Sequence, residues 1–145
     1  MNKQEIIKHY KALIQCEQFV VTGSFVLRML GLCKSNGDID IIVVNPTPDS
    51  VEMMKRLQEE FPAKTKASGE KCIIFMHEET KMDIFIVKKR IESIKLELGY
   101  EISTISHIIE AKKTMGRPKD ILQLIGMSNR IISQDEIKPY GLASL

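Results

Sequence analysis

Cysteine is scarce in this sequence, and the few that occur are not spaced for crosslinking or metal binding. The chain of 145 residues contains three cysteines, Cys16, Cys33 and Cys72. None belongs to a Cys-x-x-Cys pair, and none lies at zinc-ligand spacing from a histidine. An odd number without such spacing argues against a disulfide framework and against a structural zinc site. We therefore expect reduced, mostly buried thiols in a reducing compartment.

Long apolar runs are also missing, which argues against two further classes of protein. No stretch approaches the roughly 20 apolar residues that a membrane-spanning helix needs. Residues 1–10 are polar and amphipathic and lack the apolar centre of a secretory signal. We expect a soluble cytoplasmic protein, or one delivered as a soluble component, that does not contact a membrane.

Neither sign of charge is in large excess. The 21 basic and 19 acidic residues leave a net charge of +2, which is too small to indicate a nucleic-acid-binding protein by itself. Hydrophobic residues make up 43% of the chain, enough for one core, and the length suits one domain. We expect a single domain over residues 1–130, followed by an irregular C-terminal tail over residues 131–145.

Hydrophobic periodicity predicts strands that alternate with helices, followed by a hairpin. The predicted helices cover residues 3–16, 24–30, 49–61, 91–98, 104–115 and 118–127. The predicted strands cover residues 19–22, 38–44, 72–76 and 82–87, with a loop at 77–81 and an extended pair at 101–102. Ser24, an Asp49–Glu52 capping box and Thr104 or Ser103 are the expected helix starts, and Gly31 and Gly116 the expected ends. This order predicts an α/β (α+β) fold, a mixed β-sheet with helices packed on it.

Two acidic residues, Asp38 and Asp40, begin one of the predicted strands. Because side chains alternate along a strand, both carboxylates point to the same face, with their Cα atoms roughly 7 Å apart. Paired carboxylates can hold one or two hard cations such as Mg²⁺. A third acid, Asp83, lies near the start of a later apolar strand. It is either a third ligand or the mark of an exposed strand end.

The Gly23-Ser24 pair leads from a strand into a helix. Gly23 would let the backbone approach a ligand closely, and Ser24 with the helix N–H groups could bind a phosphate. Arg28 lies one helical turn later on the same face, toward either the phosphates or solvent. The alternative for this segment is a plain turn with a serine cap.

The order of these motifs resembles the nucleotidyltransferase superfamily, which includes polymerase beta, antibiotic nucleotidyltransferases and the minimal nucleotidyltransferases. The resemblance rests on Gly23-Ser24, Asp38-Ile39-Asp40 and Asp83, and it covers residues 19–87. It implies that Asp38, Asp40 and Asp83 are catalytic residues that bind Mg²⁺ or Mn²⁺, and that Gly23, Ser24 and Arg28 bind the nucleotide. Many active relatives have an additional helical domain for the acceptor, and little of this chain remains to form one.

A second stretch extends the resemblance to about residue 126. Residues 110–124 look like the Lys-x-x-x-x-Arg-x-Lys-Asp helix pair of abortive-infection toxins and lincosamide-type nucleotidyltransferases, with Lys112 and Arg117 in the basic positions. Lys112 and Arg117 would bind the triphosphate, or the whole basic cluster is a solvated face. We expect Asp120 to pair with a neighbouring basic residue rather than bind metal. Gln123 departs from relatives that carry an acid there.

The resemblance implies an enzyme that binds ATP or another nucleoside triphosphate. It would transfer the nucleoside monophosphate to a hydroxyl of a protein, an RNA or a small molecule and release pyrophosphate. One alternative is a catalytically silent module of the same fold, with a protein partner in a larger assembly or a toxin–antitoxin pair. Another is an unrelated α/β phosphate-binding protein.

Overall fold

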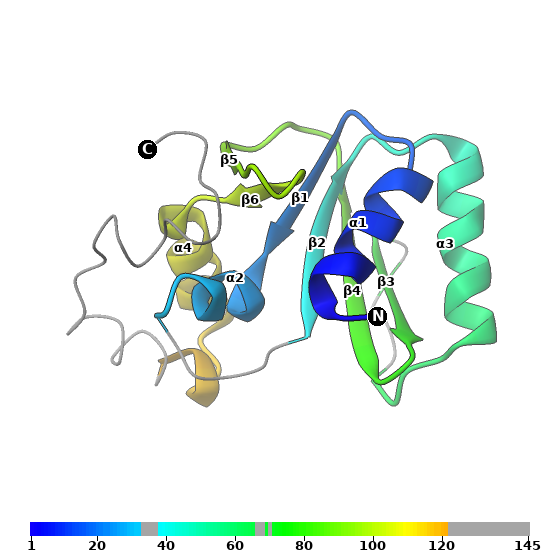
Figure 1. Cartoon of the computed structure of the whole chain (residues 1–145). Coiled ribbons are helices and arrows are strands. Elements are labelled where there is room, and N and C mark those ends of the chain that lie inside the picture. Colours follow the sequence, from blue (N-terminus) through cyan, green and yellow to red (C-terminus); the bar gives the residue numbers. More distant parts are fainter. Residues whose placement is uncertain (33–37, 66–68, 70, 122–145) are drawn as a thin grey trace.

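The computed structural model describes residues 1–32, 38–65, 69 and 71–121 (Figure 1). Helices and strands alternate through the first half of the chain and end in two hairpins and a helix. The helices are α1 (Lys3–Leu13), α2 (Gly23–Met29), α3 (Pro48–Glu60) and α4 (Ile105–Met115). The strands are β1 (Gln18–Thr22), β2 (Ile39–Val44), β3 (Cys72–His77), β4 (Thr80–Val87), β5 (Ser93–Lys95) and β6 (Glu101–Ser103).

The strands form one mixed sheet with the order β3-β4-β2-β1-β6-β5. The two central contacts to β2 differ in direction: β1 runs antiparallel to it, and β4 runs parallel to it. β6 is parallel to β1, while β3–β4 and β5–β6 are antiparallel hairpins. This arrangement confirms the predicted α/β (α+β) fold with a mixed sheet.

The main hydrophobic core lies on one face of the sheet. Val21, Ile41 and Ile84 alternate inward from β1, β2 and β4, and apolar side chains of all four helices pack against this core. The opposite face carries a small separate cluster of Val20, Ile42 and Val44. Asp40 lies two residues before Ile42, so it belongs to this second face. The strands therefore separate the core from the face that carries the acids.

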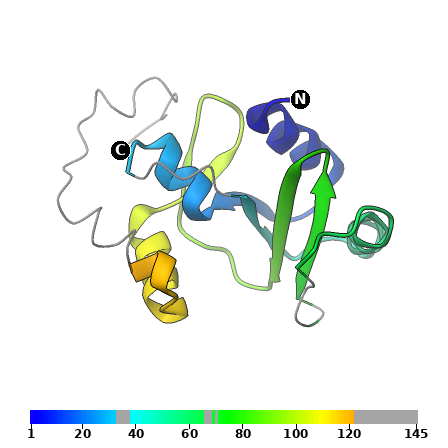
Figure 2. The same cartoon turned by 90° about the horizontal axis from the view of Figure 1, so that it is seen from below.

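The sheet places α2 and α4 on one side of the molecule and the β3–β4 hairpin with α3 on the other. Figure 2, viewed from below, shows this division. None of the helices within the described ranges combines the length and the apolar character needed to cross a bilayer.

The predicted helix over residues 91–98 is wrong. Ser93–Lys95 form strand β5, and Gly99, with φ +103°, turns the chain into β6. The cause is a long-range contact. The Gln18 side chain on β1 donates to the Ile91 carbonyl oxygen at 2.9 Å and accepts from the Ile91 N–H at 2.9 Å. These two hydrogen bonds hold the segment extended beside the sheet. The predicted extended pair 101–102 is confirmed, because these residues belong to β6.

Several predicted boundaries also change. Ser24 is not a cap, because α2 begins at Gly23 after Thr22. The Asp49–Glu52 capping box is also wrong: Thr47 Oγ1 accepts from the Ser50 N–H at 3.3 Å. The N-terminal helix ends at residue 13, and the second strand begins at residue 39 instead of 38. The loop at 77–81 shrinks to residues 78–79, since β3 and β4 continue around it.

The C-terminal end of the described chain agrees with the sequence. Thr104 caps α4, and Gly116 ends it in the left-handed conformation with φ +60°. Residues 118–121 form the first helical turn of the segment predicted at 118–127. The rest of this predicted helix lies outside the described residues, as do Gln123, the domain end at residue 130 and the tail over residues 131–145. These stay predictions.

Candidate active site

Strand pairing brings Asp40 and Asp83 together. In the parallel pair β2–β4 their Cα atoms are direct partners, so both side chains leave the same face of the sheet side by side. Asp83 is buried and Asp40 is partly buried. Asp38 precedes β2 by one residue, and its side chain is 50% exposed. The site thus consists of an inner acid pair and an outer third acid.

The inner pair is electrostatically strained without a cation. Burial raises the pKa of Asp40 well above its usual value, and the charge of Asp83, a hydrogen bond with Asp83 and the charge of Asp38 raise it further. The positive charge of Lys112 acts in the opposite direction. Asp40 therefore holds a proton more tightly than an exposed aspartate.

Lys81 joins the outer acid to the inner pair. Its Nζ lies 3.8 Å from Asp38 Oδ2 and 3.7 Å from Asp83 Oδ1. The sequence analysis missed this residue because it placed Lys81 in a loop. β4 in fact begins at Thr80, so Lys81 and Asp83 are two apart on one strand and share a face. That two-residue spacing was the available signal.

Gly23 lies directly against Asp40. Its φ is +76°, and a Cβ built on it would be 2.2 Å from Asp40 Oδ2. The sequence analysis expected Gly23 to admit a ligand; the group that approaches it here is the Asp40 carboxylate. A side chain at this position would displace that carboxylate, so the glycine fixes where Asp40 sits.

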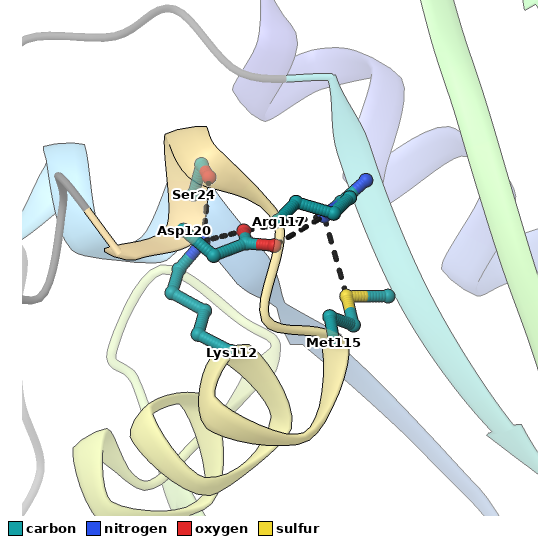
Figure 3. Close-up of polar contacts among 5 residues, drawn as sticks. All are labelled: Ser24, Lys112, Met115, Arg117 and Asp120. Atoms are coloured by element: carbon teal, nitrogen blue, oxygen red, sulfur yellow. Dashed lines mark hydrogen bonds and ion pairs between the residues drawn. The ribbon is translucent and has the colours of Figure 1, made fainter.

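A second cluster surrounds Asp120 beyond the end of α4 (Figure 3). Arg117 donates from Nε to Asp120 Oδ2 at 2.7 Å and from an Nη to Oδ1 at 3.2 Å. Lys112 Nζ donates to Asp120 Oδ1 at 3.4 Å and to Ser24 Oγ at 3.1 Å. The expected pairing of Asp120 with basic neighbours is therefore confirmed, and Ser24 on α2 is tied to α4.

Lys112 is not part of a solvated face. Its relative exposure is 6% and that of Asp120 is 0%, so an ion pair is enclosed between α4 and the following turn. The Arg117 hydrogen bond is the largest influence that lowers the pKa of Asp120, with the charges of Arg117 and Lys112 adding to it against burial. Asp120 is therefore held as a carboxylate that orients both cations.

The two clusters act on each other through charge. The pKa of Arg117 is raised first by its hydrogen bond to Asp120, and the carboxylates of Asp40 and Asp83 raise it as well. Lys112 in turn acts on Asp40. The acids and the Lys112–Arg117 pair thus lie within electrostatic reach of one another, although they come from distant parts of the chain.

Arg28, like Asp38 and Arg117, is a predicted site residue that reaches solvent. It is exposed on α2, and its charge acts on Lys3 of α1. Burial is the main influence lowering the pKa of Lys3; Arg28 lowers it further and Asp38 opposes this. Arg28 and Asp38 therefore both lie within electrostatic range of Lys3.

The donor set suits a hard divalent cation, although the side chains are not closed around one. Carboxylate oxygens are the ligands that Mg²⁺ and Mn²⁺ prefer. Among the residues that the structure describes, no three His, Cys, Asp or Glu side chains are already arranged to hold a metal. Asp40 and Asp83 are paired, whereas Asp38 faces Lys81. A third carboxylate ligand would require the half-exposed Asp38 side chain to turn toward the pair.

Comparison with known proteins gives a fold-level result. No family model matches the sequence, and no curated protein sequence matches it. A crystal structure of the TM1012 protein of Thermotoga maritima, described provisionally as a nucleotidyltransferase, is similar with a TM-score of 0.52. The similarity covers 89% of this chain and 96% of that one at 18% sequence identity. The chain has a nucleotidyltransferase fold.

Within this nucleotidyltransferase fold the acids occupy the start of the central parallel pair. Asp40 is the second residue of β2, and Asp83 is its partner on β4. The β1–α2 turn with Gly23 lies beside them, because Thr22 pairs with Asp40 across β1 and β2. The fold therefore gathers the three motifs of the sequence at one end of the neighbouring strands β1, β2 and β4.

Proposed function

We propose that this chain is a metal-dependent nucleotidyltransferase. It would transfer a nucleoside monophosphate from ATP or another nucleoside triphosphate to a hydroxyl acceptor on a protein, an RNA or a small molecule. The observation that carries the proposal is the Asp40–Asp83 pair, side by side on parallel strands with the Lys112–Arg117 cations in electrostatic range. Acids and cations in one place suit a ligand that combines a divalent metal with phosphate.

The acids would serve the reacting centre. Asp40 and Asp83, joined by Asp38, would hold Mg²⁺ or Mn²⁺, which when bound supplies positive charge to the α-phosphate and lowers the pKa of the attacking hydroxyl. Asp83, on the strand beside Asp40, would accept the proton of the acceptor hydroxyl at a carboxylate oxygen.

The basic residues would serve the phosphates. Asp120 orients Lys112 and Arg117 and offsets one of their two charges, so the cluster keeps a surplus positive charge for an anion. The Arg117 side chain is 48% exposed and can contact a ligand while held by Asp120. Ser24, bonded to Lys112, would add a hydroxyl, Gly23 would keep the turn clear of a side chain, and Arg28 would contribute from solvent.

The test is binding of each ribonucleoside triphosphate in the presence of Mg²⁺, with pyrophosphate release followed in the same sample. We expect one triphosphate to raise the melting temperature in a Mg²⁺-dependent manner, because a ligand that binds only the folded state stabilises it. Asp40→Asn should remove most of this gain. Asp49→Asn, the same change at an exposed position on α3, should keep it. The proposal fails if the wild type shows no metal-dependent shift with any triphosphate.

A second candidate is a catalytically silent module of the same fold that acts in a larger assembly or a toxin–antitoxin pair. It is favoured by the arrangement of Asp38, whose half-exposed carboxylate lies 3.8 Å from the Lys81 ammonium. Under this alternative, triphosphates would bind without pyrophosphate release, or would not bind at all. Under the same alternative, adding a cell extract as a source of hydroxyl-bearing acceptors should not increase pyrophosphate release.

A further inference from the structure

Lys81 places a positive charge where the proposed metal ligands need one. Its ammonium contacts Asp38 Oδ2 at 3.8 Å and Asp83 Oδ1 at 3.7 Å. Both partners are acids that the proposed function assigns to a divalent cation. No comparable role follows for Lys112, whose ammonium is bonded to Asp120 and Ser24 instead.

The strands fix the position from which Lys81 reaches the acids. Lys81 is paired with Met76 across the β3–β4 hairpin, two residues before Asp83 on the same face. The parallel register pairs Ile39 with Met82, which sets Lys81 beside Asp38 as the two strands begin. Only the flexible four-carbon stem of the lysine is free to change. The ammonium can therefore leave the acids without any movement of the sheet.

We propose that Lys81 is an intramolecular counter-cation that neutralises the acid site in the metal-free state and is displaced when a divalent cation binds. This inference rests on the proposed function, because it concerns the same three carboxylates. Neighbouring carboxylates repel one another unless a positive charge lies between them. An ammonium and a divalent cation at the same oxygen atoms also repel each other. Lys81 therefore stabilises the empty site and lowers its affinity for metal.

The displacement also concerns Asp38, which shares the Lys81 ammonium with Asp83. While Lys81 is in place, its ammonium offsets part of the charge of Asp38, and within the described part of the chain no third acid closes the site. Departure of the ammonium leaves Asp38 without this partner, and a cation held by Asp40 and Asp83 then attracts it. Lys81 is thus a positioning residue that sets the metal affinity of the site and does not touch the reacting atoms.

The experiment titrates Mn²⁺ alone into the full chain and compares Lys81→Met with Lys81→Arg and Lys95→Met. Lys95 is an exposed residue of β5, at the far edge of the sheet from β4, and controls for the loss of one charge. We expect Lys81→Met to bind Mn²⁺ about tenfold more tightly than the wild type, the size of a modest charge effect at a partly exposed site. Lys81→Arg and Lys95→Met should match the wild type.

A second readout is thermal stability without activity or nucleotide. In metal-free buffer Lys81→Met should melt below the wild type, because the acids lose their neutralising charge. At saturating Mn²⁺ the difference in melting temperature should shrink or vanish, since the metal has then displaced the ammonium in the wild type. A purely structural ion pair would lower the melting temperature equally under both conditions, and that result would overturn the inference.

The outcomes separate this inference from the proposed function. Unchanged Mn²⁺ affinity in Lys81→Met, with binding that depends on Asp40, rejects the role of Lys81 alone. Equal tightening in Lys81→Arg also rejects it, because the charge is then not responsible. Binding by Lys81→Met but not by the wild type supports it, as the ammonium then excludes the metal. Absence of binding by both proteins rejects the inference together with the metal-dependent function.

Discussion

Gly23 and Asp40 are packed so closely that position 23 has no room for a side chain while the Asp40 carboxylate keeps its place. A Cβ on Gly23 would lie 2.2 Å from Asp40 Oδ2, and the backbone of Gly23 has φ +76°, where side chains are rarely accommodated. The β1–β2 register enforces the contact by pairing Thr22 with Asp40. The turn into α2 and the position of the inner acid are therefore one structural feature.

Gly23→Ala should destabilise the fold by about 2–4 kcal/mol, the sum of positive-φ strain and overpacking. Gly116→Ala is the matched control, because φ is +60° there but the nearest atom to a new Cβ is 3.8 Å away. It should cost only about 1 kcal/mol. Urea unfolding measures both. Combining Gly23→Ala with Asp40→Ala should recover part of the loss, and equal losses in the two glycine variants would refute the close contact.

Asp40→Asn should become more stable relative to the wild type as the pH rises in metal-free buffer. Because the folded pKa of Asp40 is raised, the unfolded chain loses this proton first, near pH 4, while the folded chain retains it. The folded state then binds more protons than the unfolded state, so its stability falls with pH up to the folded pKa. Asparagine has no proton to lose and avoids this loss. Chemical unfolding between pH 4 and pH 8 measures the difference in the free energy of unfolding between Asp40→Asn and the wild type. A difference that stays constant over this range would mean that folding does not change the pKa of Asp40.

Asp120→Asn should show the opposite pH dependence. The pKa of Asp120 is lowered chiefly by its hydrogen bond from Arg117, so its stabilising effect is present above the unfolded pKa, near 4, and is lost as the pH falls through the folded pKa. At neutral pH the change leaves Lys112 buried without its counter-charge, at a cost of about 2–4 kcal/mol. The difference in the free energy of unfolding between Asp120→Asn and the wild type should therefore become smaller at acidic pH. Asp49→Asn, exposed on α3, should show neither effect.

Arg117→Ala should weaken triphosphate binding by about 1.5–3 kcal/mol, the range for charge-assisted hydrogen bonds. Lys112→Ala should weaken it similarly and also destabilise the fold, because Lys112 is enclosed with Asp120. Lys113→Ala is the matched control: this exposed neighbour pairs only loosely with Glu110, at 3.7 Å. Calorimetric titration and urea unfolding together measure these effects. The opposite result would be unchanged triphosphate affinity in Arg117→Ala and Lys112→Ala, together with weaker RNA binding that depends less steeply on salt concentration. In that case Lys112 and Arg117 bind nucleic acid instead.

Much of the fold is determined by patterns that lie within short stretches of the chain. The apolar run that follows Asp38 and contains Asp40 forms strand β2, and Gly116 ends α4 in the left-handed conformation. Such patterns depend only on neighbouring residues, so periodicity and turn chemistry are sufficient to read them. The mixed sheet and its helices follow from their order.

The composition of the site depends on contacts between residues far apart in the sequence. Parallel pairing of β2 with β4 brings Asp83 to Asp40, the two-residue offset from Asp83 brings in Lys81, and the enclosure of Asp120 buries Lys112. A similar long-range contact, the pair of hydrogen bonds between the Gln18 side chain and the Ile91 backbone, holds a segment that was predicted as a helix in the extended conformation of β5. Local sequence patterns do not predict which strands pair with each other or which charged side chains become buried. Those choices are made by the free energy of the assembled sheet, where hydrogen bonds across strands and the burial of charges outweigh local preference.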